Sequence, residues 1–281
     1  MFFLIAAKRI QNKEVMNTIE RNKVKIAYHL EGDGNITLFF VHGAFINLKY
    51  WSEQIEFFKK DYTVVAMDLP GHGESGKNRT DWSIQAYGND VCKLIETLNL
   101  KNVILIGHSM GGDVILEAAM ECPESIIGFI GVDIFKNAGT AMPEEIQLQI
   151  DDILDRLNTD FAATSESFAR NVLLSNETDH AITERVAADY RMMDKNIGFD
   201  LISATFNYFG RERMLMSRLN NKMYLINVEN IPTNEDLLNK YAGSGYAVVP
   251  IKGTCHYPMI ENPGEFNRLL KKVITDITLA F

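Results

Sequence analysis

The sequence predicts an α/β fold, with a mostly parallel central sheet and helices on both faces. Short apolar runs rich in β-branched residues recur along the chain and are typical of strands buried on both faces. Segments with apolar residues at helical spacing alternate with these runs in the first half. One such run, Val103–Ile106, leads straight into the pentapeptide Gly-His-Ser-Met-Gly at 107–111, and a helical pattern from Met110 to Met120 follows. This strand–turn–helix unit is the centre of the predicted fold.

The composition is that of an ordinary globular chain, long enough for one large α/β domain with an insertion. The chain has 281 residues, of which 46% are hydrophobic and 23% are charged. Its 28 basic and 37 acidic residues give a net charge of −9, which disfavours nucleic acid and anionic membrane surfaces as partners. Three cysteines are too few for a disulfide framework, so we expect a reducing, cytoplasmic location.

The N-terminal run MFFLIAAK is apolar but short. It is too short to span a bilayer and has no basic residue before it, as a secretory signal would. No other run approaches the length of a membrane span, so we expect no membrane insertion. We regard residues 1–15 as a candidate leader, with Met16 as an alternative start.

The first part of the chain contains most of the predicted sheet. The first two predicted strands form an antiparallel pair joined at Arg21-Asn22, and the later ones alternate with helices. Asp81 is the expected N-cap of the second helix. The predicted strands are Val15–Glu20, Lys23–Leu30, Ile36–Val41, Tyr62–Met67, Val103–Ile106 and Ile126–Val132. The predicted helices are Tyr50–Lys59, Trp82–Leu100 and Met110–Met120.

From about residue 135 to about residue 219 strand signals vanish and helical periodicity takes over. The predicted helices there are Glu144–Leu157, Phe161–Leu174, Thr183–Met193 and Phe199–Phe209. The sheet resumes with Met223–Val228 and Tyr246–Ile251, before a last helix at Glu265–Ile277. We therefore expect a core of residues 1–134 and 220–281, with a helical cap, or lid, of residues 135–219 inserted into it.

The pentapeptide at 107–111 has the G-x-S-x-G pattern that a sharp strand-to-helix turn requires. Such a turn holds Ser109 at its tip with the hydroxyl exposed, at the N-terminus of the following helix. The free N–H groups and partial positive charge of that end suit a developing oxyanion. With Gly112 extending the motif, this stretch resembles the nucleophile elbow of the α/β-hydrolase fold superfamily.

Three further motifs carry the same resemblance, which covers nearly the whole chain from about Lys23 onward. They are His-Gly-Ala at 42–44, Pro-Gly-His-Gly-Glu-Ser-Gly at 70–76, and Gly-Thr-Cys-His at 253–256 followed by Glu-Asn-Pro at 261–263. The last is similar to the family's histidine loop. The resemblance implies a serine-nucleophile member with a helical cap, similar to esterases and haloperoxidases.

A serine needs a base, and the base needs an orienting acid. Of the histidines, only His180 and His256 follow the elbow at a distance, and His180 lies in the predicted cap, where a surface role is the default. The position of His256 after the last strand is that of the family's catalytic histidine. The resemblance also implies an oxyanion hole made by the backbone N–H groups of Ala44 and Met110, with Phe45 as the alternative to Ala44. His42 and His72 are expected to brace their loops.

The acid is where the chain departs from the commonest family pattern. A Gly-x-x-Asp turn usually follows the penultimate strand, but here Val228 stands at the glycine and Ile231 at the aspartate. Asp133 ends the strand after the nucleophile helix, and some family members, including certain haloalkane dehalogenases, carry their acid there. Glu229 lies two residues before the lost position and is the alternative. We favour Asp133.

These residues predict a serine hydrolase that cleaves a small or medium, mostly apolar carboxylic ester, thioester or lactone through an acyl-enzyme. A serine nucleophile argues against haloalkane dehalogenase and epoxide hydrolase, which form ester intermediates on a carboxylate. The same triad also serves C–C, amide and perhydrolysis chemistry, and some relatives are ligand-binding signalling proteins. No metal-ligand spacing or phosphate-cradling loop appears, so we expect no cofactor and no metal, and only a small-molecule apolar partner. The sequence names neither a substrate nor an oligomeric state.

The predicted cap also suggests the shape of the binding site. Its helices carry many apolar residues, and those that do not pack the cap onto the core are expected to line a closed, mostly apolar pocket with the triad at its floor. The candidates are Ile146, Ile150, Leu154, Phe161, Phe168, Leu173, Met192, Met193, Phe206, Tyr208 and Phe209.

Overall fold

The computed structural model describes residues 16–137, 139–140 and 144–281. At its centre lies an eight-stranded sheet with the strand order β1-β2-β4-β3-β5-β6-β7-β8. The strands are β1 (Asn17–Arg21), β2 (Val24–Glu31), β3 (Thr37–Val41), β4 (Thr63–Met67), β5 (Val103–His108), β6 (Ile126–Val132), β7 (Met223–Val228) and β8 (Tyr246–Ile251). The candidate leader, residues 1–15, lies outside the described residues, and so does Val15 of the first predicted strand.

The direction of the strands confirms the mostly parallel sheet. β2 runs antiparallel to β1 and β4, whereas every pairing from β4 through β3 to β8 is parallel. Parallel strands end at the same edge of a sheet, which is where open α/β sheets bind ligands. The segments that follow β3, β5, β6 and β8 contain His42, Ser109, Asp133 and His256. The sheet therefore collects the predicted site residues at one edge.

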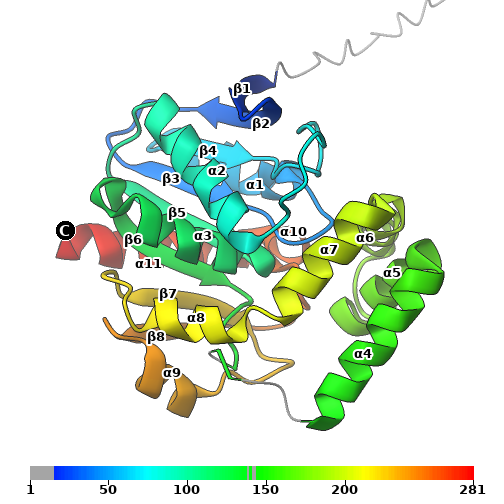
Figure 1. The fold of residues 1–281 in the computed structure, drawn as a ribbon. Coiled ribbons are helices and arrows are strands. Elements are labelled where there is room, and N and C mark those ends of the chain that lie inside the picture. Colours follow the sequence, from blue (N-terminus) through cyan, green and yellow to red (C-terminus); the bar gives the residue numbers. More distant parts are fainter. Residues whose placement is uncertain (1–15, 138, 141–143) are drawn as a thin grey trace, which may run out of the picture.

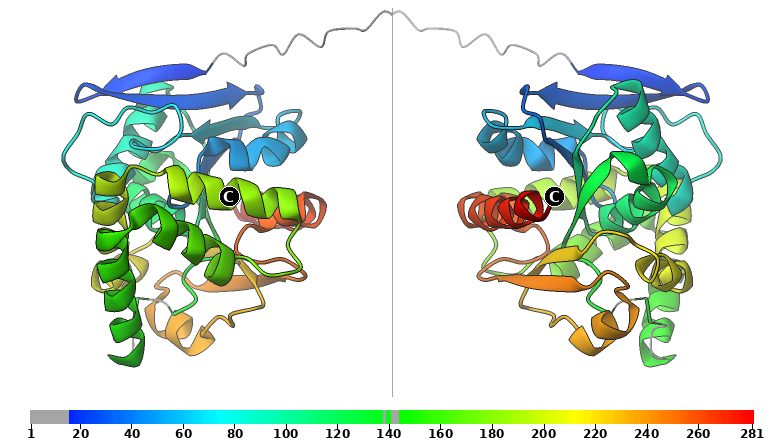
Figure 2. Two further views of the ribbon diagram at one scale, coloured as in Figure 1. Left: turned by 90° about the vertical axis from the view of Figure 1, so that its right-hand side faces the viewer. Right: turned by 90° about the vertical axis from the view of Figure 1, so that its left-hand side faces the viewer.

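Helices cover both faces of the sheet. Figures 1 and 2 show α2 (Ile84–Thr97), α3 (Met110–Glu121) and α8 (Phe209–Met216) over one face and α1 (Ser52–Phe58) and α11 (Pro263–Ala280) over the other. The α-helices of this core are α1 (Ser52–Phe58), α2 (Ile84–Thr97), α3 (Met110–Glu121), α9 (Glu235–Tyr241), α10 (Pro258–Glu261) and α11 (Pro263–Ala280). Short 3₁₀ turns cover Leu48–Trp51 and Pro123–Ser125. The three-layer α/β architecture is thus the predicted one.

In the described chain five further α-helices lie between β6 and β7. They are α4 (Glu144–Thr159), α5 (Phe161–Phe168), α6 (His180–Met192), α7 (Lys195–Phe206) and α8 (Phe209–Met216), and a π-helical turn, Ala169–Leu173, extends α5. In Figure 1, α4 to α7 stand together beside the sheet, whereas α8 packs against α3. None of the helices in the described part of the chain is both long and apolar enough to cross a membrane.

Two details of the predicted helices are wrong. The helix predicted at Phe199–Phe209 begins earlier, at Lys195, and ends at Phe206, where Asn207 caps α7 and its side-chain amide donates to the Ser203 carbonyl oxygen at 2.8 Å; Phe209 begins a separate helix, α8. The N-cap of α2 is Ser83, whose hydroxyl accepts from the Ala86 N–H. Asp81, the predicted N-cap, instead accepts from the Ser83 N–H at 3.0 Å and shapes the turn before the helix.

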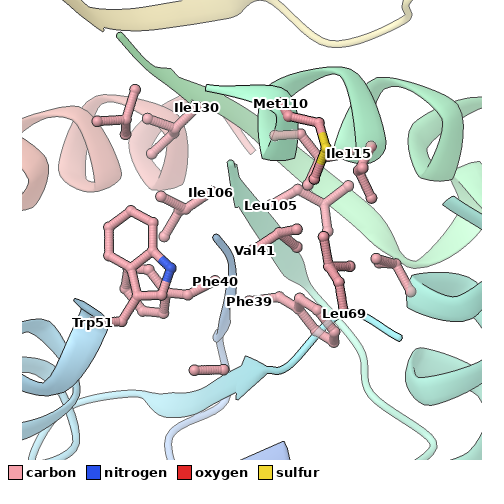
Figure 3. Close-up of a cluster of buried hydrophobic side chains, with 14 of the residues drawn as sticks. Phe39, Phe40, Val41, Trp51, Leu69, Leu105, Ile106, Met110, Ile115 and Ile130 are labelled. Atoms are coloured by element: carbon pink, nitrogen blue, oxygen red, sulfur yellow. The ribbon is translucent and has the colours of Figure 1, made fainter. Parts of the chain in front are cut away.

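The packing of the core explains why the sequences of the central strands are continuous apolar runs. Alternate side chains of a strand point to opposite faces, and both faces are covered by helices. Phe40 packs against Trp51 on one face, with ring centroids 5.0 Å apart, whereas Phe39 and Leu105 face the side of α3 (Figure 3). Leu105 pairs with Phe39 in the register of β3 and β5. This packing anchors the strand that carries the G-x-S-x-G turn.

One disulfide differs from the sequence-based expectation. Cys92 of α2 and Cys122 at the C-cap of α3 are bonded, with Cα atoms 5.9 Å apart, while Cys255 is free. The two cysteines are 30 residues apart in the chain and meet because α2 and α3 pack side by side on one face of the sheet. A count of cysteines carries no information about such packing.

Candidate active site

Ser109 sits at a strained turn between β5 and α3. Its φ of 51° and ψ of −129° are unusual for a residue with a side chain. Its N–H donates to the Val132 carbonyl oxygen at 2.9 Å, which ties the turn to β6. A Cβ atom at Gly107 would lie 2.3 Å from the Gly111 carbonyl oxygen, so the turn closes only with glycine there. The motif thus holds a half-buried Ser109 at the head of α3.

His256 lies in the loop after β8, and the side chain of Asp133 lies against it. The His256 Nδ1 nitrogen is 2.6 Å from Asp133 Oδ2. Because a carboxylate only accepts, this contact places the imidazole proton on Nδ1 and leaves Nε2 free to act as a base. The ring is fixed in the tautomer that a Ser–His–Asp mechanism needs.

The loop that carries His256 is fixed by hydrogen bonds on both sides. The Glu261 carboxylate accepts from the Cys255 N–H at 2.9 Å and from the Tyr257 N–H at 2.8 Å. The His256 carbonyl oxygen accepts from His108 Nε2 at 2.7 Å, and the two imidazole rings lie 4.7 Å apart. His108 immediately precedes Ser109, so this bond ties the histidine loop to the elbow.

Asp133 is placed by an unusual backbone turn at the end of β6. Its φ is 50°, and its Oδ1 oxygen accepts from the Val228 N–H at 3.2 Å and from Lys136 Nζ at 2.7 Å. Burial raises the pKa of Asp133, but the hydrogen bond and charge of His256, with the charge of Lys136, outweigh it and hold this pKa at about 2. Asp133 is therefore a carboxylate at neutral pH. The other candidate acid, Glu229, is exposed and pairs with Lys252 at 3.6 Å.

The loop after β3 lies against the elbow. A Cβ atom at Gly43 would lie 3.1 Å from Ser109 Cβ, so glycine permits this close approach. The His42 side chain braces the loop: its Nδ1 donates to the Gly43 carbonyl oxygen at 2.7 Å, and its Nε2 accepts from the Leu69 N–H at 3.0 Å. Within the described residues, the backbone N–H groups of Ala44 and Met110 donate to no backbone acceptor outside regular secondary structure.

A small apolar cavity, of about 20 Å³, lies under the helices between β6 and β7. Phe45, the residue after Ala44, is one of its lining residues, and no lining side chain is charged. Of the cap residues predicted to line a pocket, Phe168 and Phe206 do so, but Ser109 and His256 are not in the lining. The lining residues are Phe45, Ile153, Leu157, Ser165, Phe168, Tyr190, Ile202 and Phe206.

A second, more polar cavity of about 240 Å³ lies on the Asp133 side and includes Lys136, Asp113 and Glu212 in its wall. In the part of the chain that the structure describes, no group of three or more His, Cys, Asp or Glu side chains is arranged to hold a metal ion.

Sequence reasoning missed three residues that shape the site. His108 lies in the G-x-S-x-G motif, and Glu261 in the Glu-Asn-Pro segment, but neither motif indicates the hydrogen bonds that these two side chains make. Lys136 has no signal in the sequence, since its contact with Asp133 depends on the turn between them.

The comparisons with known proteins concern the fold and the family. A family profile described as alpha/beta hydrolase fold matches residues 36–196, more than half of the chain. Among curated relatives, (E)-2-((N-methylformamido)methylene)succinate hydrolase of Acinetobacter baylyi is 31% identical over 112 residues, covering 40% of this chain and 43% of that protein. A putative esterase/lipase of Haemophilus influenzae is 35% identical over 96 residues, covering 34% and 33%. The matched segments thus span less than half the length of these relatives.

Solved structures match over nearly the whole chain. Est816, described as an N-acyl homoserine lactone degrading enzyme, aligns with a TM-score of 0.77 at 22% identity and covers 91% of this chain and 99% of that one. The esterase EaEST of Exiguobacterium antarcticum aligns with a TM-score of 0.77 at 16% identity, covering 90% and 96%. At such identities the likeness establishes the fold alone. Together with the profile match, it shows that this chain belongs to the α/β-hydrolase fold family.

Proposed function

We propose that the protein is a serine hydrolase that cleaves a small or medium, mostly apolar carboxylic ester, thioester or lactone through an acyl-enzyme. The observation that carries this proposal is the 2.6 Å contact between His256 Nδ1 and Asp133 Oδ2, in a loop hydrogen-bonded to the residue before Ser109. That contact orients the imidazole, and the elbow presents a serine at a helix N-terminus. These are the parts that acyl transfer requires.

In the proposed mechanism the Ser109 Oγ attacks the acyl carbonyl carbon while His256 Nε2 takes the hydroxyl proton. The oxyanion of the tetrahedral intermediate accepts hydrogen bonds from the N–H groups of Ala44 and Met110. The intermediate collapses, and the leaving alkoxide receives the proton from His256. Water then attacks the acyl carbon with His256 again as base, which releases the acid and restores Ser109. Asp133 stays ionised throughout and stabilises the imidazolium.

We also propose that residues 135–219 form the lid and that residues 1–134 and 220–281 form the core. The placement of α4 to α7 together beside the sheet supports this division, whereas α8, the last helix of the proposed lid, packs on α3. The lid also contacts the core directly. The His256 N–H donates to the carbonyl oxygen of Leu173, which lies in the π-helical turn. The Phe45 ring, next to Ala44, packs against Phe161 and Tyr190 with centroids 5.6 and 5.1 Å apart. The lid therefore meets both the histidine loop and the oxyanion loop.

The apolar cavity supports the choice of substrate class. The lining of this cavity carries no charged side chain, which suits an apolar acyl group and offers no partner to a charged one. Phe45 links the cavity to the loop of Ala44, so the acyl chain would extend from the oxyanion hole beneath the lid.

A hydrolase-like ligand-binding protein is the second candidate, and one observation favours it. Neither Ser109 nor His256 lines the apolar cavity, so a ligand held there need not reach the serine. C–C, amide and perhydrolysis chemistry use the same triad and are variants of the first proposal.

Turnover of p-nitrophenyl esters with rising acyl chain length separates these candidates. We expect cleavage of short esters, a steep fall for long chains and no activation by emulsified lipid. If short esters are not cleaved above background while a small apolar ligand raises the melting temperature, the binding proposal is favoured. If emulsified long-chain lipids are the best substrates, the acyl-cavity proposal is wrong even though a serine mechanism is retained.

A further inference from the structure

The carboxylate of Asp133 has a second partner besides His256. Lys136 Nζ lies 2.7 Å from Asp133 Oδ1, and the two side chains are 11% and 5% exposed. The His256 contact is made by the other oxygen, Oδ2. One carboxylate is thus shared between an imidazole and a largely buried ammonium group.

The loop that carries Lys136 is itself fixed by hydrogen bonds. The side-chain amide of Asn227 accepts from the Ile134 N–H at 3.1 Å and donates to the Ile134 carbonyl oxygen at 3.0 Å. The Lys136 carbonyl oxygen accepts from the Asn234 N–H at 2.8 Å. Phe135 has a φ of 57°, which turns the chain back over Asp133. These bonds hold both ends of the turn that brings Lys136 to the carboxylate.

We propose that Lys136 is a positioning residue for the triad: it holds Asp133 with Oδ2 toward His256 and lowers the basicity that Asp133 confers on His256. The expected effect of Lys136 on kcat rests on the proposed serine hydrolase function, whereas the expected effect of Lys136 on the His256 ring does not. An ammonium beside the carboxylate offsets part of the negative charge that stabilises the imidazolium. Without Lys136 the imidazolium is more stable, and His256 stays protonated to a higher pH.

Among the described residues around His256, Lys136 is the cation that contacts Asp133. His108 faces His256 from β5, and burial lowers the pKa of His108 to about 3, so it is neutral. Tyr257 adjoins the His256 ring, and the Glu261 carboxylate is occupied by backbone N–H groups. Asp113 and Glu212 share the polar cavity with Asp133 but do not contact it. Glu229 and Lys252 form an exposed pair of their own.

The test compares Lys136→Met and Lys136→Gln, which remove the charge, with Lys136→Arg, which keeps it. The matched control is Lys93→Met, because Lys93 also pairs with a carboxylate three residues away, Glu96, but its side chain is 40% exposed. Two readouts are followed against pH: the low-field proton NMR signal of the His256 Nδ1–H, which needs no substrate, and kcat and KM for a short p-nitrophenyl ester.

We expect the NMR midpoint and the acid limb of kcat to move up by about one pH unit in Lys136→Met and Lys136→Gln. The Lys136→Arg and Lys93→Met variants should keep the wild-type midpoint. The loss at neutral pH should fall on kcat more than on KM, and more in Lys136→Met than in Lys136→Gln, which keeps a hydrogen-bond donor. If Lys136→Met does not fold, Lys136→Gln carries the comparison.

An unmoved midpoint in both charge-removing variants would overturn the inference, and so would an equal shift in Lys136→Arg. The two proposals fail separately. A shifted midpoint without ester turnover supports the role of Lys136 and contradicts the proposed function. Ester turnover with an unmoved midpoint does the opposite.

Discussion

The Nδ1 nitrogen of His256 lies 2.6 Å from the Oδ2 oxygen of Asp133, although 123 residues separate them in the chain. Asp133 follows β6 and His256 follows β8, and β7 lies between these strands in the sheet. Both side chains therefore reach along the sheet edge across the end of β7. Val228 is the last residue of β7, and its N–H donates to Asp133 Oδ1. The intervening strand therefore helps to fix the carboxylate.

This relationship predicts that Asp133 is the triad acid. Asp133→Asn should lose activity on the order of 10⁴-fold in kcat, because an amide favours the wrong histidine tautomer. The matched control is Glu229→Gln, which removes the exposed carboxylate paired with Lys252 and should lose far less. The measurement is kcat for a short p-nitrophenyl ester, with circular dichroism as a check on folding. The reverse ranking would show that Glu229 is the acid.

The ambiguity between these two residues shows where sequence reasoning stops. The apolar runs predicted the central strands β3 to β7, because burial on both faces leaves a plain pattern of residues. The G-x-S-x-G motif located Ser109, because only glycine permits the close approaches around it. The choice between Asp133 and Glu229 depends on which carboxylate the sheet edge brings to His256, and this is a matter of three-dimensional distance.

The same limit explains the details that were wrong or missed. Asp81 and Ser83 are both good capping residues two positions apart, and local sequence does not separate them. The bond between Cys92 and Cys122 depends on how α2 packs on α3. Lys136 reaches Asp133 through a turn in which Phe135 has a positive φ. A residue with a side chain rarely adopts this conformation, so the sequence does not predict it.

A second prediction concerns acid stability. Burial lowers the pKa of His72 to about 4 and that of His108 to about 3, whereas histidine in an unfolded chain titrates near 6.5. Below about pH 6.5 the unfolded chain therefore binds more protons than the folded protein. The stability that these two residues contribute is complete above about pH 6.5 and is lost as the pH falls toward 4 and 3. Each should add a slope of up to about 1.4 kcal/mol per pH unit in this range.

Urea unfolding at a series of pH values measures this slope. His72 Nδ1 lies 3.2 Å from the Pro70 carbonyl oxygen, and His72→Asn keeps a donor for that oxygen but does not titrate. This variant should remove the contribution of His72 to the slope, which is the uptake of one proton. His180→Asn is the matched control, because the His180 side chain is 89% exposed. An unchanged slope in His72→Asn would mean that His72 is not held neutral by the fold.

A third prediction concerns the cavity at Phe45. Ile202→Trp places a large ring in a lining position and should shift the preferred p-nitrophenyl ester toward shorter acyl chains. Activity on the acetate ester should change little, because the serine is not in the cavity wall. Ile231→Trp, at a position that is 53% exposed, is the control and should leave the chain-length profile unchanged. An unchanged profile in Ile202→Trp would place the acyl group elsewhere.

A fourth prediction concerns the disulfide. Without reductant, the unfolded protein should contain one reactive thiol, Cys255, and after reduction it should contain three. For a pair of cysteines 30 residues apart, the double variant Cys92→Ala with Cys122→Ala should lose about 3 to 4 kcal/mol of stability. Cys255→Ser should not show this loss. Three reactive thiols before reduction would show that the bond is absent.

The most direct test of the central claim is covalent labelling of Ser109. A fluorophosphonate should add one label to the native protein, and peptide mapping should place it on Ser109. Ser109→Ala should abolish the label while the melting temperature stays close to that of the wild type, and Ser217→Ala, at an exposed serine on the C-cap of α8, should be labelled normally. Undiminished labelling of Ser109→Ala, or a label on another serine, would contradict the serine hydrolase mechanism.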